Sequence, residues 1–357
     1  MKKKILSVIK YLFFLGIGVF LIWWQLGKMT TVQQTEFIES LKNIHYIYLV
    51  PAVIMAVLSH WSRAMRWKIL IEPMGYKPST SNTFYATICG YLANNFVPRA
   101  GEILRCTLLS KYEKIPFTKL VGTIIVERLL DLVSYFIIIA ITILIQVKTV
   151  SDFVNEKIAA IADSEVNMPG WMVIAGIFIL MALFYFIVRF LLVKYNEHTL
   201  AIKFRKLQVG LKEGFLTIMH LKKKKLFLAH TVFIWTMYLL QIYVGFYALS
   251  ETAHLNIQAA FSVLSLSTLA MIISPGGIGA FPVAVQQVLL IYHLDNISFG
   301  WLMWGVNTSI IIILGIICFI LLIYQNRNIN EKNGQHQGED ITQGRNRETG
   351  HPVEAQK

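Results

Sequence analysis

Several apolar stretches of this chain are long enough to cross a lipid bilayer, and no other feature limits its fold as strongly. The clearest lie at 5–27, 118–147 and 299–324. A hydrocarbon core of about 30 Å needs roughly 20 apolar residues in a helix, since each residue rises about 1.5 Å. Hydrophobic residues make up 55% of the chain and charged residues only 15%. The sequence therefore predicts an all-α polytopic membrane protein.

We expect six full spans, at 5–27, 45–62, 118–147, 170–193, 226–249 and 299–324. Residues 1–325 would then form a single transmembrane domain, followed by a polar tail, 326–357, that we expect to be disordered and cytoplasmic. The first span follows Lys2, Lys3 and Lys4 and is too long for the apolar region of a signal peptide. We therefore expect it to be retained.

Two further apolar segments are interrupted by proline and glycine. In the first, 82–112, the apolar run before Pro98 covers only roughly 21 Å as a helix. The second, 258–294, breaks at the sequence Ser-Pro-Gly-Gly-Ile-Gly, 274–279. Non-helical backbone at membrane depth is tolerated only where protein or a water-filled cavity covers it. We expect two broken hairpins, although the second segment could also cross the membrane twice as thin helices.

The charges of the loops indicate the orientation. Segment 194–225 contains nine Lys or Arg against two Glu, whereas loop 148–168 contains two Lys against four acidic residues. Cytoplasmic loops carry the excess of basic residues, so the first segment is predicted to be cytoplasmic and the second external. With a cytoplasmic N-terminus, this requires that 82–112 returns to the side from which it entered. Both termini are then predicted to be cytoplasmic.

The order span, span, hairpin, span occurs twice, in 5–147 and 170–324. Because each unit has three full crossings, the second unit would be inverted relative to the first. Inverted repeats with paired broken helices indicate a transporter-like binding site near the bilayer midplane. Helix N-termini meeting at the hairpin tips would favour an anion. Apolar runs of similar length are also common without any repeat.

Three ionisable residues, Glu127, Arg128 and Asp131, lie ten to thirteen residues into their expected span, or about 15–20 Å deep. Such groups are costly at that depth unless they are paired. They could form an ion-pair network with Arg99 or Arg105 that locks helices together, or they could line a headgroup or proton-coupled site. The sequence leaves both alternatives open.

Arginines near the first break suit phosphate, because guanidinium groups bind it in a bidentate manner. A surface loop whose arginines reach lipid headgroups is the simpler alternative. We predict the substrate-binding residues Arg99, Glu102, Arg105, Glu127, Arg128 and Asp131, and the gating positions Pro98, Gly101, Pro275, Gly276, Gly277 and Gly279.

Arg63 and Arg66, beside Trp61 and Trp67, are interpreted instead as an interfacial anchor belt.

The net charge of +13 lies in loops between apolar runs, which favours anionic lipid headgroups over nucleic acid as partners. The three cysteines show no paired or metal-type spacing, so we expect no disulfide and no metal. The glycine-rich turn at 275–279 lacks the Lys-Ser/Thr of a nucleotide-binding loop, and we expect no cofactor.

Four motifs occur in order along the chain: Arg63-x-x-Arg66-Trp67, Pro98-x-Ala100-Gly101-Glu102-x-x-Arg105, Glu127-Arg128-x-x-Asp131 and Pro275-Gly276-Gly277-Ile278-Gly279. Together they resemble the lysylphosphatidylglycerol synthase transmembrane, or flippase-like, family, the membrane part of the multiple peptide resistance factor. The resemblance covers about residues 5–325. It implies a bacterial or archaeal cytoplasmic-membrane protein and, for this module, lipid translocation.

Two departures from the family pattern matter. The full synthases carry a soluble aminoacyl-transferase domain after the membrane part, whereas this chain shows no counterpart after about 325, so we expect a stand-alone member. Similar sequences often place a Glu shortly after the Pro-Gly-Gly-x-Gly turn. Here Ala280-Phe281-Pro282 stands there, which puts in doubt any role that needs a carboxylate.

The leading hypothesis is a flippase, not an enzyme, that moves an anionic or phosphate-bearing lipid, including aminoacylated or polyprenyl-phosphate lipids, across the bacterial cytoplasmic membrane. One alternative is an intramembrane lipid-modifying transferase with Glu102 or Asp131 as the base. Another is a non-catalytic subunit that recruits a lipid- or glycan-modifying enzyme through 194–225. Membrane lipids are the expected partners, while a homo-oligomer and a partner enzyme stay open.

Overall fold

The computed structural model describes residues 31–97, 100–148 and 218–348, together with isolated positions between 20 and 29 and between 151 and 190. The expected spans at 5–27 and 170–193 lie largely outside the described residues. So do most of the two loops on which the predicted orientation depends, and so do Pro98 and Arg99.

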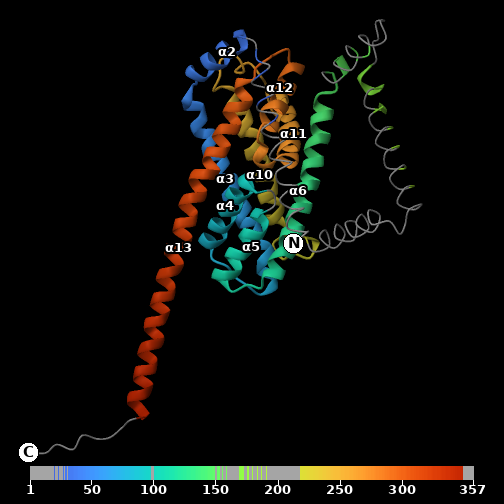
Figure 1. Cartoon of the computed structure of the whole chain (residues 1–357). Coiled ribbons are helices and arrows are strands. Elements are labelled where there is room, and N and C mark those ends of the chain that lie inside the picture. The colour runs from blue at the N-terminus through green and yellow to red at the C-terminus, as the bar shows by residue number, and fades with distance from the viewer. Residues whose placement is uncertain are drawn as a thin grey trace, which may run out of the picture.

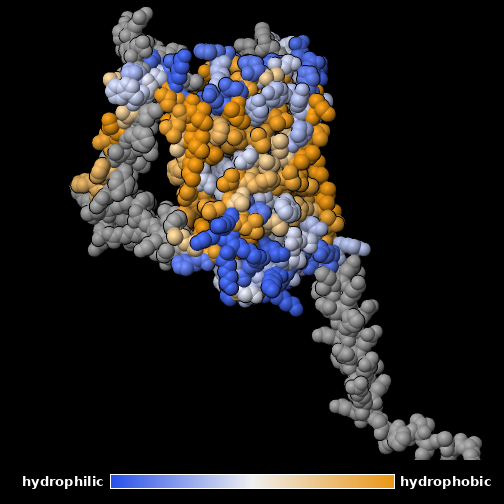
Figure 2. Space-filling model, turned by 180° about the vertical axis from the view of Figure 1, so that it is seen from behind, coloured by the Kyte–Doolittle hydropathy of each residue, from blue (hydrophilic) through white to orange (hydrophobic). Residues whose placement is uncertain are grey.

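Four helices in the described part of the chain are long and apolar enough to cross a membrane. They are α3 (Tyr46–Ile71), α6 (Phe117–Ile145), α10 (Lys224–Phe246) and the part of α13 (Ser298–Glu348) that ends at Asn326. Figure 2 shows a belt of hydrophobic side chains between two hydrophilic ends of the molecule. Such a belt is what a bilayer requires of the surface that it covers. The prediction of an all-α polytopic membrane protein is confirmed.

Two pairs of shorter helices form the broken segments. The first pair is α4 (Thr80–Phe96) and α5 (Ala100–Glu113), and the second is α11 (Ile257–Ile273) and α12 (Ala280–Ile291). A helix of 17 residues such as α4 or α11 is only about 25 Å long, less than the hydrocarbon core. The members of each pair pack against each other. Figure 1 shows the first pair in the lower half of the molecule and the second in the upper half, so both are hairpins that enter from opposite ends.

The two hairpins begin and break in the same way. Ser79 caps α4 by accepting a hydrogen bond from the Asn82 N–H at 3.1 Å, and Asn256 caps α11 by accepting one from the Ala259 N–H at 3.1 Å. Each of these helices ends in an extended residue, Val97 or Ser274. Helices α4 and α11 therefore run from opposite ends of the molecule toward its middle, where both break (Figure 1).

The hairpin tips meet in the middle of the molecule. The short 3-10 turn η2 (Pro275–Gly277) lies against α4, and a Cβ added to Gly276 would stand 3.2 Å from the Asn95 Oδ1. Gly276 has a φ of 59°, in the left-handed region where a side chain is disfavoured. The Trp304 indole N–H donates to the Gly276 carbonyl oxygen at 2.9 Å and holds the turn against α13.

Packing between the helices is symmetric when the unit α3–α6 is exchanged with the unit α10–α13. In this exchange α3 corresponds to α10, α4 to α11, α5 to α12 and α6 to α13. Helices α3 and α10 pack on each other. The contact of α4 with α13 matches that of α11 with α6, and the contact of α5 with α6 matches that of α12 with α13. The hydrogen bonds near the two ends of the molecule correspond as well. Gln146 at the end of α6 donates to the Gln258 carbonyl oxygen at 2.6 Å, and Asn326 in α13 donates to the Asn82 Oδ1 at 2.9 Å. This is the arrangement expected of an inverted repeat.

Two elements extend further than expected. Helix α3 continues nine residues beyond 62, the predicted end of the span, because Arg63 and Arg66 are buried in the protein and need not end it. Helix α13 runs on to Glu348, so part of the tail that we expected to be disordered is helical. Extending an existing helix costs little, because only its first turn is unfavourable.

Close packing of α4 on α5 generates a prediction about Gly101. A Cβ there would collide with the carbonyl oxygen of Gly90 and would stand 2.6 Å from the Asn94 Cγ. We expect Gly101→Ala to lower the free energy of unfolding by about 1–3 kcal/mol, as overpacking usually does. Denaturant unfolding of the protein in detergent would measure this. Gly122→Ala in α6 is the control, since nothing lies within 4 Å of its added Cβ; equal effects of the two variants would contradict the prediction.

Candidate functional site

Five charged side chains from three helices meet between the two ends of the molecule. Helix α3 supplies Arg63 and Arg66, α5 supplies Arg105, and α6 supplies Glu127 and Asp131. The two arginines of α3 are three residues apart and the two carboxylates of α6 are four residues apart, so each pair lies on one face of its helix. Packing α3 and α5 on α6 brings these faces together. We call these five residues the charge cluster.

Ion pairs inside the charge cluster are short and shared. Asp131 accepts from Arg63 at 2.5 Å and from Arg66 at 2.7 Å. Glu127 accepts from Arg105 at 2.8 Å and from Arg66 at 3.2 Å, and it lies 3.5 Å from Arg63. The side chains of Arg66 and Glu127 are 0% and 1% exposed. Each carboxylate is therefore held by at least two arginines, with Glu127 fully buried and Asp131 14% exposed.

Neighbouring residues of α3 and α10 complete the surroundings of the guanidinium groups. Arg63 also donates to the Tyr238 hydroxyl at 3.1 Å, and Arg66 donates to the Thr231 hydroxyl at 3.3 Å. The Trp67 ring lies 4.8 Å from the Arg105 Cζ, within the range of a cation–π interaction. The cluster thus joins α10 of the second unit to three helices of the first.

The charge cluster has one more positive than negative group, because three arginines face two carboxylates. Several of its buried N–H groups make no hydrogen bond to another described residue: Arg63 Nε, Arg66 Nε, Arg105 Nε and Arg105 Nη1. A buried donor without an acceptor costs free energy. Guanidinium donors in a dry site are the groups that carboxylate or phosphate oxygens satisfy best.

A polar face of α4 leads from the charge cluster to the hairpin tip. The Tyr91 ring lies 6.0 Å from the Arg63 Cζ and 5.0 Å from the His60 ring, and Asn95 follows one turn further along α4. Three buried atoms, the Tyr91 hydroxyl, the His60 Nδ1 and the Asn95 Nδ2, also lack a hydrogen-bond partner within the described ranges. Because Asn95 touches Gly276, this face ends where the two hairpins meet.

The predicted site residues divide into two groups. Arg105, Glu127 and Asp131 belong to the charge cluster, which has the form of the ion-pair network considered from the sequence. Glu102 and Arg128 form a separate pair at 2.7 Å, with side chains 24% and 45% exposed. Of the predicted gating positions, Gly101 and the three glycines of the second break lie at the hairpin tips. Pro98 and Arg99 lie outside the described residues.

Interpreting Arg63 and Arg66 as an interfacial anchor belt is wrong. Both are buried, at 7% and 0% exposed, and both bind carboxylates of α6. The error came from ending the span at the first arginine, as if a charge had to mark the membrane surface. Their spacing of three residues on a helix that faces Glu127 and Asp131 was the signal that could have identified them.

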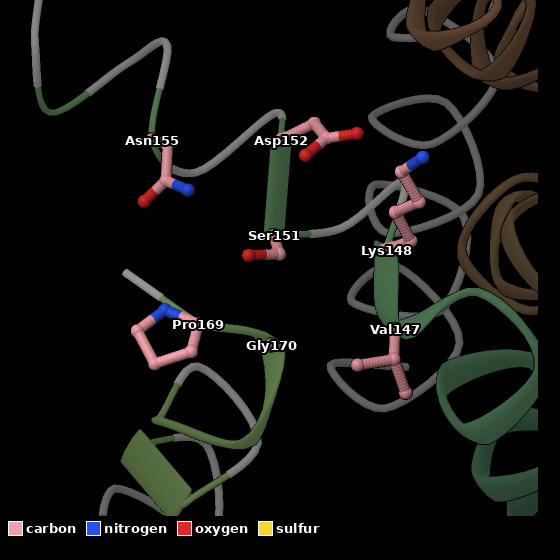
Figure 3. A pocket seen from close by; sticks show the side chains of 7 residues that line it. All are labelled: Val147, Lys148, Ser151, Asp152, Asn155, Pro169 and Gly170. Atoms are coloured by element: carbon pink, nitrogen blue, oxygen red, sulfur yellow. The ribbon is translucent and has the colours of Figure 1, made fainter. Parts of the chain in front are cut away.

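A second place with polar side chains is a hollow of about 340 Å³ beyond the end of α6, lined by Val147, Lys148, Ser151, Asp152, Asn155, Pro169 and Gly170 (Figure 3). Val147 lies twenty residues beyond Glu127, or roughly 30 Å away along a helix. The hollow therefore belongs to the end of the molecule and not to the charge cluster. Among the described residues, no group of His, Cys, Asp or Glu side chains is arranged to hold a metal.

Removing one carboxylate tests whether the charge cluster is a coupled unit. Glu127→Gln leaves the buried charge of Arg105 uncompensated, while Arg66 keeps only Asp131, so we expect the free energy of unfolding to fall by about 3–5 kcal/mol. Denaturant unfolding in detergent measures the change. In the control, Glu72→Gln breaks the exposed pair with Lys223 at 2.6 Å and should cost much less, because water screens that pair. A cost for Glu127→Gln as small as that of the control would contradict a coupled cluster.

Comparisons with known proteins agree with this architecture. A family model described as the lysylphosphatidylglycerol synthase TM region matches residues 8–315. A UPF0104 membrane protein of Methanocaldococcus jannaschii is 32% identical over 133 residues, which are 36% of this chain and 36% of the relative. The aligned part thus spans little more than a third of that relative's length. No solved structure matches the chain.

Proposed function

Because this chain belongs to the lysylphosphatidylglycerol synthase TM region family, we propose that it moves an anionic or phosphate-bearing lipid between the leaflets of a bacterial cytoplasmic membrane. The family supports a multi-pass membrane protein involved in lipid handling. The step from lipid handling to translocation rests on the geometry of the charge cluster.

One observation carries the proposal: the cluster has an excess positive charge and buried guanidinium donors without a partner among the described residues. A cluster that served only to lock helices together would need no excess of arginine. Buried charge is costly in a membrane protein and usually marks a pathway or a site. A phosphate diester, with one negative charge and several acceptor oxygens, would neutralise the excess and accept from these donors.

The hairpins support a route for the headgroup. Helices α5 and α12 both begin at the tips, so the positive ends of their dipoles face the middle of the molecule. The Asn94 side chain accepts from the Gly101 N–H at 2.8 Å and the Val97 carbonyl oxygen accepts from the Ala100 N–H at 3.1 Å, so the start of α5 is fixed against the end of α4. The breaks at Pro98–Gly101 and Pro275–Gly279 are the positions where each hairpin could bend to admit or release the headgroup.

Roles follow from position. Arg63 and Arg105, together with Tyr91 and Asn95, would hold the phosphate, while Glu127 and Asp131 would keep the guanidinium groups in place. We propose transport in place of covalent chemistry because both candidate bases are already paired: Asp131 with Arg63 and Arg66, and Glu102 with Arg128. Arg99 keeps the role that the sequence predicted, which is to bind the substrate.

Basic residues support an orientation. Near the connection from α5 to α6 and the start of α10 lie Lys68, Lys77, Lys111, Lys114, Lys119, Lys222, Lys223, Lys224 and Lys225. By the excess of basic residues in cytoplasmic loops, this end would face the cytoplasm. Asn326 of α13 contacts Asn82 at the same end, so the C-terminal part of α13 would also be cytoplasmic.

Headgroup-labelled lipids in proteoliposomes test the function. A panel of anionic, aminoacylated and polyprenyl-phosphate lipids would be compared for movement between leaflets, with wild type and Tyr91→Phe. We expect wild type to move at least one phosphate-bearing lipid, and Tyr91→Phe to slow it about tenfold, the effect of losing roughly 1.4 kcal/mol of binding.

Tyr243→Phe is the matched control, since it removes a hydroxyl that lies 3.0 Å from the Tyr247 hydroxyl, away from the charge cluster. It should leave the rate unchanged. Failure of the folded wild type to move any lipid of the panel would overturn the proposed function.

A further inference from the structure

A charged pair lies on the outer surface of the described membrane-spanning helices, where lipid chains would be expected. Arg128 is three residues before the midpoint of α6, or about 4.5 Å from it along the axis. Its guanidinium lies 2.7 Å from Glu102 of α5, and its side chain is 45% exposed. Apolar neighbours on the same helix, Ile125 and Leu132, are 57% and 41% exposed, so this face of α6 is turned outward.

Such a pair is out of place on a purely structural surface. A charged side chain near the bilayer centre costs several kcal/mol on insertion scales unless it is covered or paired. An exposed ion pair contributes little to stability and therefore offsets little of that cost. The other carboxylate oxygen of Glu102, Oε2, is buried and makes no hydrogen bond to the described parts of the chain, so it points inward from this surface. The pair therefore indicates that something polar reaches this part of the surface.

The pair is directly connected to the charge cluster. On α5, Glu102 and Arg105 are one turn apart; on α6, Glu127 and Arg128 are adjacent. Glu102 binds Arg128 on the outside while Arg105 binds Glu127 on the inside, so two ion pairs bridge the same two helices one step apart. A phosphate that exchanged its partner from Arg128 to Arg105 would pass from the lipid-facing surface into the molecule between α5 and α6.

We propose that the Glu102–Arg128 pair is a lateral gate, through which a lipid's phosphate group enters between α5 and α6 while the acyl chains stay in the bilayer. The inference rests on the proposed function and adds the point of entry to it. The arriving phosphate replaces Glu102 as the partner of Arg128, and Glu102 is released toward its own helix. No covalent bond is formed or broken.

The gate belongs to one leaflet. Helices α5 and α6 meet at the end of the molecule where α5 ends at Glu113 and α6 begins at Phe117, so the seam between them runs from that end to the hairpin tip. The corresponding seam between α12 and α13 carries no such pair: counted from the first residue of each helix, Pro282 stands in the place of Glu102 and Ser309 in that of Arg128. Phosphate is therefore loaded from the leaflet at the α5–α6 connection.

A reversible cross-link tests the gate. In the variant Glu102→Cys/Arg128→Cys, a bifunctional methanethiosulfonate reagent would bridge the two thiols, since cysteine side chains are shorter than the pair they replace. We expect the bridged variant to move labelled phospholipid no faster than protein-free vesicles do, and dithiothreitol to raise its movement only to the slower rate of a gate that can open but lacks Arg128, which the single variant Arg128→Cys measures. Recovery on reduction shows that the variant is folded. The native Cys89, Cys106 and Cys318 are buried, and reagent-treated wild type checks that they do not react.

Glu72→Cys/Lys223→Cys provides the matched control, because it bridges another exposed ion pair, 2.6 Å long, between η1 (Glu72–Met74) and the start of α10. The same reagent should leave movement by this variant unchanged. If wild type moves lipid and the bridged gate variant moves it equally well, the gate is overturned and the proposed function stands. Absence of movement in wild type would overturn the proposed function and the gate together. A covalent dimer formed through Arg128→Cys alone would show a second copy at this surface and would also overturn the gate.

Discussion

The buried ion pairs between α3, α5 and α6 determine how the described part of this protein is assembled. Two carboxylates of α6 are shared among Arg63, Arg66 and Arg105, which join one full span to one arm of a hairpin and to a second span. Helix α10 closes the site through the hydroxyls of Thr231 and Tyr238. Hydrophobic burial adds little between helices in lipid, so polar contacts and close packing carry more of the association. The three arginines and two carboxylates that hold the first unit together therefore also give it an excess positive charge.

The two units share a scaffold but not a chemistry. Counted from the helix starts, Gln241 in α10 takes the place of Arg63 in α3, and Asn307 in α13 falls one residue from the place of Glu127 in α6. These two amides bind each other at 2.8 Å, where the first unit has an ion pair. An amide pair satisfies its own donors and acceptors without net charge. The second unit thus has a neutral pair where the first unit has an ion pair. We therefore assign the binding of an anion to the first unit.

Sequence reasoning predicted the hairpins well because proline and glycine have direct backbone consequences. The breaks before Gly101 and at Pro275–Gly279 lie where the pattern placed them. The side-chain partners were harder to predict, since pairing depends on which helix faces are brought together by packing. Arg128 was considered as a member of one ion-pair network with Glu127 and Asp131, yet it pairs with Glu102 on the outer side of α5 and α6. Arg63 and Arg66 were assigned to the membrane surface because hydropathy ends a span at a charge, whether or not a carboxylate lies opposite.

If the charge cluster binds one lipid phosphate, this binding can be measured without any transport. Native mass spectrometry of the protein released from nanodiscs would compare phosphatidylglycerol with uncharged diacylglycerol at equal concentration, in wild type and in Tyr91→Phe. We expect one phosphatidylglycerol to be retained per protein in preference to diacylglycerol, with weaker retention in the variant. Equal retention of the two lipids, or retention of phosphatidylglycerol that the variant leaves unchanged, would contradict this expectation.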